Sequence, residues 1–348
     1  MNGALISVVI TTYNEENNIE KCVKSILDQS YKNLEIIVID DGSEDGTWNI
    51  LQKLSKQYGI HILKQKNMGV SVARNRGIHE ANGTWIVFCD ADDFYFPLAI
   101  EQLEFAASRY KCDVVQGGLK RSNTENKENC IKILPSKIVE HLLLNYNTIL
   151  DHNKYSWIDP HIRFSIHGPY GKLIKRDFII QNGIYFSEEL KLGEDLLFFL
   201  KLLSLTNEIV IVTRDVYNVT MNANSVTRKF NPELPDAADK FVYAAIDFLK
   251  KNKLYTELRW DLNYQIYMHF SIAVNRYYMH PENKNGYIKK VVEFKRFASK
   301  DIYSTCFGFM RQYVPKKTTW IGLSLLKWRM FCLYFFLQDF KRRIGDIE

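Results

Sequence analysis

Hydrophobic and polar positions alternate between two periods over the first hundred residues. Residues 5–11 form a nearly continuous run of apolar and β-branched side chains, which is typical of a strand buried on both faces. Residues 18–27 instead carry apolar side chains at the spacing of one helix face. The alternation continues with predicted strands at 34–39, 61–63 and 85–89 and predicted helices at 48–58, 70–81 and 98–110. Repeated strand–helix units predict an α/β fold, with a Rossmann-like, mostly parallel sheet flanked by helices.

The second half of the chain follows a different pattern. Residues 190–205 predict a strong helix. Beyond Asn231 and Pro232 the pattern is helical to the end, without the alternation that is typical of strands. We therefore expect two domains, an α/β domain over residues 1–228 and a helical C-terminal region over residues 229–348.

Charge is distributed unevenly along this chain. Its 46% hydrophobic and 25% charged residues are ordinary for a globular protein, which excludes a largely disordered chain. Of the net charge of +6, residues 289–348 contribute +8, from 13 Lys and Arg against 5 Asp and Glu, so the remainder sums to −2. A basic tail suits an anionic membrane surface or a nucleic acid. Because no nucleic-acid-binding motif appears, no nucleic-acid partner is expected.

Cysteine usage and the N-terminal sequence bear on the cell compartment. The six cysteines show no C-x-x-C pair and no zinc-like spacing, and Cys22 and Cys89 lie in apolar runs typical of buried free thiols. That pattern fits a reducing cytoplasm. The N-terminus lacks a basic leader and a cleavage site, and no stretch reaches the ~18 consecutive apolar residues of a membrane span. We expect a cytoplasmic protein, either free or at the inner face of the cell membrane.

Three polar loops follow the predicted strands and would meet at one edge of the sheet, where open α/β folds bind ligands. In one of them, Asp90 and Asp92 end a buried strand. Their carboxylates suit Mg²⁺ or Mn²⁺, which usually share their coordination shell with phosphates. In isolation, an acidic turn that caps the helix near Pro97 is the better interpretation. The surrounding polar loops favour the metal site.

The loops after the first two strands predict a pocket for a nucleotide base. Asp41 follows the second strand, where a carboxylate can accept hydrogen bonds from a base or a ribose. Thr11 and Tyr13 follow the first strand and would line the same pocket, Tyr13 by stacking. A simple turn, in which Gly42 supplies a positive φ and Ser43 a cap, explains the second loop equally well.

Two predicted helices begin with charged residues. Arg74 lies in the first turns of one and can pair with a phosphate, although an exposed surface arginine fits the sequence equally. Glu194 and Asp195 follow Gly193 at the start of the strongest helix. Unpaired backbone N–H groups keep a carboxylate ionised there, so Asp195 can act as the general base for a sugar hydroxyl. As an isolated motif, an N-terminal cap is the simpler interpretation.

Five blocks between residues 5 and 227 resemble those of the family 2 glycosyltransferases with the GT-A fold. In order they are ISVVITTYNEENNIEKCVKSILDQSYKNLEIIVIDDGSEDGT, NMGVSVARNRGI, WIVFCDADD, GPYGKLIKRDFI and LGEDLLF. One further position departs from the pattern. Family members often have an arginine three residues before a serine in a later loop, and Asn222 stands there in this chain. A diphosphate or acceptor contact made by that arginine is therefore in doubt.

The resemblance implies an inverting, metal-dependent transfer of a hexosyl or N-acetylhexosaminyl group from a nucleoside-diphosphate sugar, most often a UDP-sugar. The implied donor-binding residues are Thr11, Tyr13 and Asp41 at the base, Asp90 near the ribose and Asp92 at the Mn²⁺ or Mg²⁺ ion. Asp195 is the implied catalytic base, with Glu194 supporting it. The implied acceptor is a glycan or a lipid-linked sugar in bacterial surface-polysaccharide synthesis.

Other functions are less consistent with the sequence. A sugar-1-phosphate nucleotidyltransferase or a dinucleotide-dependent oxidoreductase favours a glycine-rich loop after the first strand, whereas this chain has Thr-Thr-Tyr-Asn there. A catalytically silent nucleotide-sugar-binding protein would be expected to lose its acidic residues, and Asp41, Asp92 and Asp195 are all present. The silent binder remains the alternative.

The tail over residues 320–343 combines aromatic and apolar residues with interspersed Lys and Arg. This composition resembles a helix that lies in a membrane interface. A helix that packs on residues 235–280, or one that contacts a second copy in a homo-oligomer, explains the same composition. Both interpretations, peripheral membrane contact and burial, stay open on sequence alone.

Overall fold

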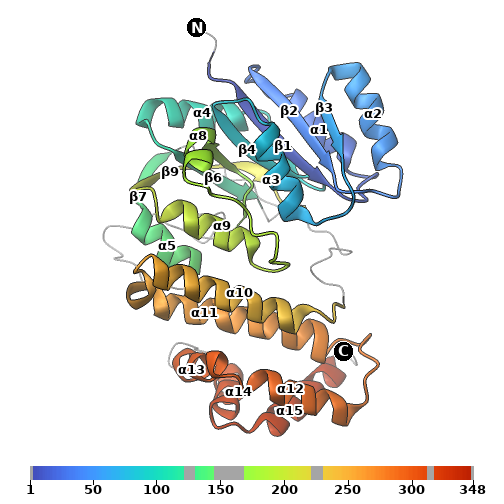
Figure 1. The fold of residues 1–348 in the computed structure, drawn as a ribbon, viewed down its shortest axis with the longest axis vertical. Helices are drawn as coiled ribbons and strands as arrows, with labels where there is room; N and C mark the ends of the chain where they lie inside the picture. Colours follow the sequence, from blue (N-terminus) through green and yellow to red (C-terminus); the bar gives the residue numbers. More distant parts are fainter. Residues whose placement is uncertain (1–2, 121–129, 145–167, 221–229, 312–316, 346–348) are drawn as a thin grey trace. The chain divides into compact units, whose positions relative to one another are not determined.

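The computed structural model describes residues 3–120, 130–144, 168–220, 230–311 and 317–345. The chain divides into two compact units, Met1–Met221 and Asn222–Glu348. Figure 1 shows the first unit as a β-sheet with helices, in blue to yellow, and the second as helices, in orange to red.

The described part of the first unit contains a nine-stranded sheet in the order β3-β2-β1-β4-β8-β6-β9-β5, with β7 paired to β9. The strands are β1 (Ile6–Thr12), β2 (Leu34–Asp40), β3 (His61–Lys64), β4 (Trp85–Asp90), β5 (Phe94–Tyr95), β6 (Val114–Lys120), β7 (Ile131–Pro135), β8 (Lys172–Lys175) and β9 (Glu208–Asn218). The strands β3, β2, β1 and β4 run parallel, as do β6 and β9, whereas β8, β5 and β7 pair antiparallel with their neighbours. The sheet is therefore mixed.

Helices cover both faces of this sheet. They are α1 (Ile19–Leu27), α2 (Thr47–Tyr58), α3 (Val70–Glu80), α4 (Ala99–Tyr110), α5 (Ser136–Leu144), α8 (Arg176–Gln181) and α9 (Glu194–Leu203). Because side chains alternate along a strand, Val8 joins the core formed with α1, α2 and α4, while Val9 faces α3. On the face of α3, Phe88 of β4 packs edge-to-face on Phe198 of α9, with ring centroids 6.3 Å apart.

The strand–helix alternation predicted for the first 110 residues is confirmed, with element ends within two residues of the expected positions. The predicted helix over 190–205 begins later, at Glu194, because Gly193 adopts a left-handed conformation with φ of 78° at its N-cap. Cys22 and Cys89 are buried free thiols, as expected, with their sulfur atoms 3.4 Å apart. The short strands β5 and β8 were not predicted, because two to four residues carry too little periodicity.

The second unit is helical throughout its described residues. Its elements are α10 (Leu234–Lys251), α11 (Tyr255–Ala273), the π-helical turn η2 (Val274–Tyr278), α12 (Tyr287–Ala298), α13 (Asp301–Met310), α14 (Lys317–Lys327) and α15 (Phe331–Gly345). Its core gathers around Phe270 of α11, whose ring lies 5.4 Å from that of Phe297 and 4.9 Å from that of Phe307. Among the described helices, none has the length and apolar character needed to cross a bilayer.

Candidate active site

The carboxyl ends of β1, β2 and β4 meet at one edge of the sheet, as the parallel order requires. Thr11 pairs in register with Ile39 on one side and with Asp90 on the other. The loop after β1 is tied to the loop after β2, since the N–H of Asn14 donates to Ser43 Oγ at 2.9 Å. Tyr13, the residue before Asn14, has 42% of its surface exposed. An exposed ring beside two ordered loops is available to stack on a planar base.

Asp41 lies at this edge and organises the neighbouring loop. Its carboxylate accepts hydrogen bonds from the backbone N–H groups of Met68 at 2.9 Å and Gly69 at 2.8 Å, and from Gln65 Nε2 at 2.8 Å. Gly42 adopts the positive φ of 82° that the turn interpretation expected, and an added Cβ would lie 2.7 Å from the backbone nitrogen of Asn67. Asp41 therefore fixes the entry to α3, and its carboxylate oxygens can accept further hydrogen bonds from a ligand.

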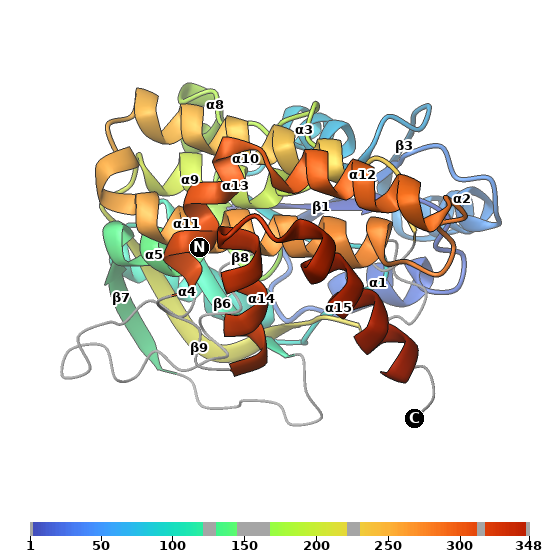
Figure 2. The same cartoon turned by 90° about the horizontal axis from the view of Figure 1, so that it is seen from below.

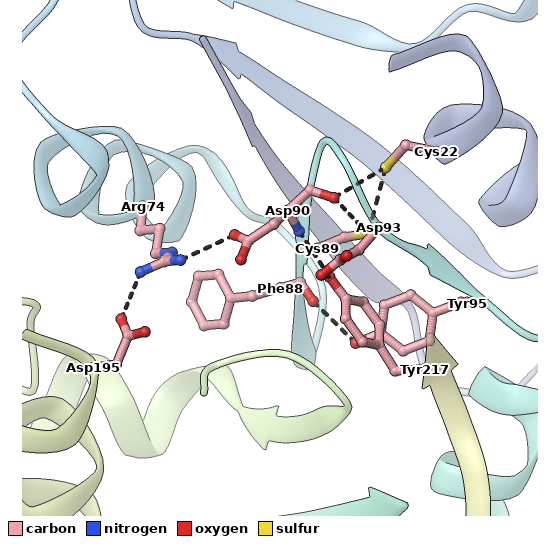
Figure 3. Close-up of polar contacts among 9 residues, drawn as sticks. All are labelled: Cys22, Arg74, Phe88, Cys89, Asp90, Asp93, Tyr95, Asp195 and Tyr217. Atoms are coloured by element: carbon pink, nitrogen blue, oxygen red, sulfur yellow. Dashed lines mark hydrogen bonds and ion pairs between the residues drawn. The ribbon is translucent and has the colours of Figure 1, made fainter. Parts of the chain in front are cut away.

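Arg74 joins two of the acidic loops (Figure 3). Its Nη2 lies 2.9 Å from Asp90 Oδ1 at the end of β4, and its Nη1 lies 2.6 Å from Asp195 Oδ1 in the first turn of α9. The guanidinium side chain is only 5% exposed, whereas the two carboxylate side chains keep 27% and 26% exposure. The interpretation of Arg74 as an exposed surface arginine is therefore wrong. One buried cation holds together two solvent-accessible carboxylates, of which Asp195 lies 121 residues from Arg74 in the chain.

The carboxylates do not cap the helices that follow them. The N-cap of α9 is Gly193, and no side chain makes a capping hydrogen bond there. The N-cap of α4 is Leu98, also without a side-chain cap, so the acidic turn before it does not serve that helix either. In both places the capping alternative that the sequence left open is wrong, and the carboxylates are directed to other partners.

Burial changes the acid strength of this cluster. It raises the pKa of the Asp195 carboxyl above its ordinary value, and the Arg74 cation counteracts that rise. Burial, followed by the charge of Asp195, raises the pKa of Glu194 to about 7. Perturbed carboxyl groups that gather at the ligand-binding edge of a sheet are typical of a catalytic site.

The acidic loop after β4 has the chemistry of a divalent-cation site. Asp92 is partly exposed beside Asp90 and Asp93. Burial raises the pKa of Asp93 to about 8, and the negative charge of Asp90 adds to that rise. Among the described residues no three His, Cys, Asp or Glu side chains form a complete metal cage. The loop nevertheless fits Mg²⁺ or Mn²⁺, because these ions take one or two carboxylates from the protein and phosphate oxygens from the substrate.

Tyr217 and Tyr95 hold this acidic loop in place and were not predicted from the sequence. The Tyr217 hydroxyl donates to Asp93 Oδ2 at 2.8 Å and accepts from the N–H of Asp90 at 3.1 Å. The Tyr95 hydroxyl donates to the Phe88 carbonyl at 2.9 Å. Tyr170 stacks on Tyr217 with ring centroids 4.9 Å apart. Tyr217 reaches the loop through the unpredicted pairing of β9 with β5 and β6.

Lys172 is a second buried cation, and the sequence did not indicate its burial or its effect on Asp195. The residue is 2% exposed, its ammonium lies over the Phe199 ring at 4.2 Å, and its charge lowers the pKa of Asp195. It comes from β8, which pairs antiparallel with β4 and β6. The position Asn222, singled out for its missing arginine, lies outside the described residues.

The family model described as "Glycosyl transferase family 2" matches residues 7–165. The uncharacterised glycosyltransferase EpsJ of Bacillus subtilis is 27% identical over 76% of this chain and 75% of its own length. The glycosyltransferase GlyA of Streptococcus pneumoniae is 27% identical over 81% of this chain, which spans only 38% of that protein. YibD of Escherichia coli is 40% identical over 32% of this chain and 33% of its own length.

The fold is shared with a solved structure over almost the full chain. The structure of Staphylococcus aureus TarS 1–349 in complex with UDP-GlcNAc matches with a TM-score of 0.66 at 19% identity, covering 98% of this chain and 92% of TarS 1–349. The predicted α/β fold with a helical C-terminal region is thereby confirmed. The matched family model and the related glycosyltransferases show that residues 7–165 carry a glycosyltransferase family 2 domain.

Proposed function

We propose that the protein is an inverting glycosyltransferase that moves a sugar from a UDP-sugar to a hydroxyl of a glycan or lipid-linked acceptor. The observation that carries the proposal is the bridge by which Arg74 joins Asp90 to Asp195. The bridge brings the loop that would face the donor diphosphate next to the carboxylate that would take the acceptor proton. A binding protein without chemistry has no need to hold a partly exposed carboxylate there.

The transfer follows from this arrangement. The acceptor oxygen attacks C1 of the donor sugar, its bond to C1 forms as the bond from C1 to the diphosphate oxygen breaks, and its proton passes to Asp195. Arg74 occupies Oδ1 of that carboxylate, so we assign the proton to Oδ2. The burial that raises the pKa of Asp195 makes it a stronger base, while Arg74 keeps it ionised. Glu194 supports the negative potential at the same helix start.

The donor would lie along the edge formed by β1, β2 and β4. Tyr13 would stack on the base and Thr11 would line it, while Asp41 accepts from the base or the ribose. Asp90, fixed by Arg74, would stand beside the ribose and the diphosphate. A divalent cation held by Asp92 supplies positive charge for the leaving diphosphate when it is bound. Structures of TarS 1–349 with UDP-GlcNAc and with UDP support UDP as the nucleotide.

Related enzymes support a lipid-linked acceptor in surface-polysaccharide synthesis. WfaP of Escherichia coli, a UDP-Glc:alpha-D-GlcNAc-diphosphoundecaprenol beta-1,3-glucosyltransferase, is 39% identical over 29% of this chain and 41% of its own length. The putative teichuronic acid biosynthesis glycosyltransferase TuaG of Bacillus subtilis is 42% identical over 30% of this chain and 43% of its own length. A lipid-linked acceptor would require the enzyme to work at the inner face of the cell membrane.

The test compares wild type, Asp195→Asn and the exposed control Asp177→Asn. UDP release from UDP-glucose and UDP-GlcNAc is measured with a GlcNAc-diphospholipid acceptor, and UDP affinity is measured by calorimetry. Asp195→Asn should lower turnover by about 10²–10⁴-fold with UDP affinity retained, because only proton acceptance is lost. A chelator should weaken UDP binding in wild type and change it little in Asp92→Asn.

Two results would contradict the proposal. Near-normal turnover in Asp195→Asn would remove that residue from the role of base. UDP binding by wild type without turnover on any sugar acceptor would instead favour the silent nucleotide-sugar-binding protein. The Asp177→Asn control should match wild type in both measurements.

A further inference from the structure

Helix α15 has an apolar side chain on nearly every side, and one of its faces is buried. Phe331, Tyr334 and Phe335 are at most 7% exposed and pack on Phe294 of α12, with ring centroids 5.4–6.4 Å apart. Helices α12 and α15 lie side by side in Figures 1 and 2. This face makes α15 part of the core of the second unit.

The opposite side of α15 is apolar and exposed. Leu333, Phe336 and Phe340 are 41%, 54% and 52% exposed, and the rings of Phe336 and Phe340 stack on each other at 6.2 Å. These residues are three, four and seven apart, so they form one stripe along the helix. Trp328 and Met330, at 58% and 44% exposure, are two further exposed apolar side chains in the turn before the helix. We call these five residues the outer stripe.

The turn between α14 and α15 holds the first part of the outer stripe in a fixed conformation. Arg329 adopts a left-handed φ of 56°, and the N–H of Met330 donates to the Leu325 carbonyl at 2.8 Å. The Arg311 guanidinium lies over the Trp328 ring at 5.3 Å. A non-glycine residue held at positive φ shows that the surrounding contacts determine this turn.

The charges that border the outer stripe are mostly positive. Lys327 and Arg329 are exposed on either side of Trp328 in the sequence, and Lys341 is exposed next to Phe340. Within the described part of α15 the acidic side chain is Asp339, which lies 3.6 Å from Arg342 in an ion pair. An exposed aromatic stripe with a basic border has the composition of a surface that lies in a membrane interface.

We propose that the outer stripe docks the protein on an anionic membrane surface, with α15 lying in the plane of the headgroups. A second copy of the chain is a poorer occupant, because a symmetric contact would bring the basic borders together. An anionic leaflet neutralises those charges while its acyl boundary takes up the aromatic side chains. A lipid-linked acceptor would give this docking its use, and in that respect it rests on the proposed function.

The test uses the full chain and co-sedimentation with vesicles of phosphatidylglycerol and phosphatidylcholine, compared with phosphatidylcholine alone. Wild type should bind the anionic vesicles preferentially. Phe336→Ser combined with Phe340→Ser should weaken that binding by about tenfold or more, since each substitution removes an exposed aromatic ring from the interface. Tyr243→Ser, which removes a 55% exposed aromatic from α10, should bind as wild type does.

The charges are tested separately from the aromatic rings. Lys327→Gln combined with Arg329→Gln should lose much of the preference for anionic vesicles, and raising the salt concentration should mimic that loss. Circular dichroism should show unchanged folding in each variant, because all substituted side chains are exposed.

Equal vesicle binding by the Phe336 and Phe340 double variant and by wild type would overturn the proposal. So would a wild-type dimer that ignores vesicles and dissociates in the double variant, which would make the stripe a contact between copies. Vesicle binding is measured without donor or acceptor, so its failure leaves the proposed transfer untouched. Failure of transfer would likewise leave a positive vesicle result intact.

Discussion

At the scale of single residues, Arg74 is a buried cation whose position depends on its two carboxylate partners. Its guanidinium is almost fully buried and lies between two carboxylates that solvent still reaches. A buried cation of this kind needs the paired charges, because an unpaired one costs several kcal/mol. Arg74 therefore determines both the position and the acid strength of the carboxylate that we propose as the base.

Arg74→Gln should shift the acid limb of kcat/KM to higher pH. Burial raises the pKa of Asp195, and the Arg74 cation lowers it. Removal of this cation should therefore raise the pKa, so that Asp195 stays protonated, and inactive as a base, up to a higher pH. Arg74→Lys keeps the charge but not the two-pronged bridge, so it should lower kcat with a smaller shift of the limb. pH–rate profiles of the three proteins check this. A loss of rate without any shift in Arg74→Gln would mean that the residue only supports the structure.

Glu194→Gln should stabilise the protein at alkaline pH. The pKa of Glu194 is raised from 4.5 to about 7 in the folded protein, so the folded state binds the additional proton between these values. Proton binding at Glu194 therefore adds to the free energy of unfolding. This contribution is complete below pH 4.5 and is lost as the pH rises towards 7. The neutral amide of Glu194→Gln does not titrate and so avoids this loss. Above pH 7 the variant should therefore have a free energy of unfolding about 1–2 kcal/mol higher than wild type, after allowance for partial solvent exposure. Urea unfolding at pH 5 and pH 8 measures it, with exposed Glu189→Gln as the control. If Glu194→Gln and wild type differed in free energy of unfolding by the same amount at pH 5 and pH 8, the raised pKa of Glu194 would be disproved.

At the scale of elements, close packing of α3 on β1 brings Arg74 to the site. Gly77 of α3 faces Val9 of β1 so closely that an added Cβ would lie 2.2 Å from Val9 Cγ1. Gly77 lies in a helix, where glycine itself is unfavourable, so the contact is the reason for its presence. The helix carries Arg74 three residues earlier, about one turn along the same helix, and its distance from the sheet fixes where the guanidinium lies.

Gly77→Ala should destabilise the first unit by about 1–3 kcal/mol, because overpacking a filled core forces side chains or backbone to move. Val9→Ala creates room at the same point, so the double variant should be more stable than the sum of the two single effects predicts. Thermal or urea unfolding of wild type, the two single variants and the double variant gives the coupling free energy between Gly77 and Val9. Additive effects would mean that the two residues are not in the contact described here.

At the scale of the whole molecule, the C-terminal helices α14 and α15 pack into the core of the second unit. Leu323, Leu326 and Phe335 are at most 1% exposed, so α14 and α15 bury side chains on one side while α15 exposes the outer stripe on the other. Both interpretations of the tail, burial and an exposed aromatic surface, therefore describe real faces of the same helix. Removal of the tail would remove both at once.

Truncation after Lys317 should accordingly unfold or destabilise the second unit instead of leaving a folded protein without its tail. The loss of α15 uncovers Phe294, and each large apolar side chain taken from a core costs about 1.5–3 kcal/mol, a large part of a domain's stability. Limited proteolysis should degrade the truncated second unit while a fragment ending near Met221 persists. A truncated protein as resistant as wild type would show that α14 and α15 are dispensable for folding.

The sequence by itself determined the order of strands and helices over the first 110 residues, because continuous apolar runs and helical spacing are local patterns. It also determined that Thr11, Asp41 and Asp90 follow parallel strands and so meet at one edge of the sheet. The tertiary structure decided what those residues contact. Asp90 and Asp195 are far apart in the chain, and no local period encodes the buried arginine that joins them. Tyr217 and Lys172 reach the site on β9 and β8, whose pairing depends on contacts distant in sequence. For α15, composition determined that the helix is apolar, whereas packing on α12 decided which face remains exposed.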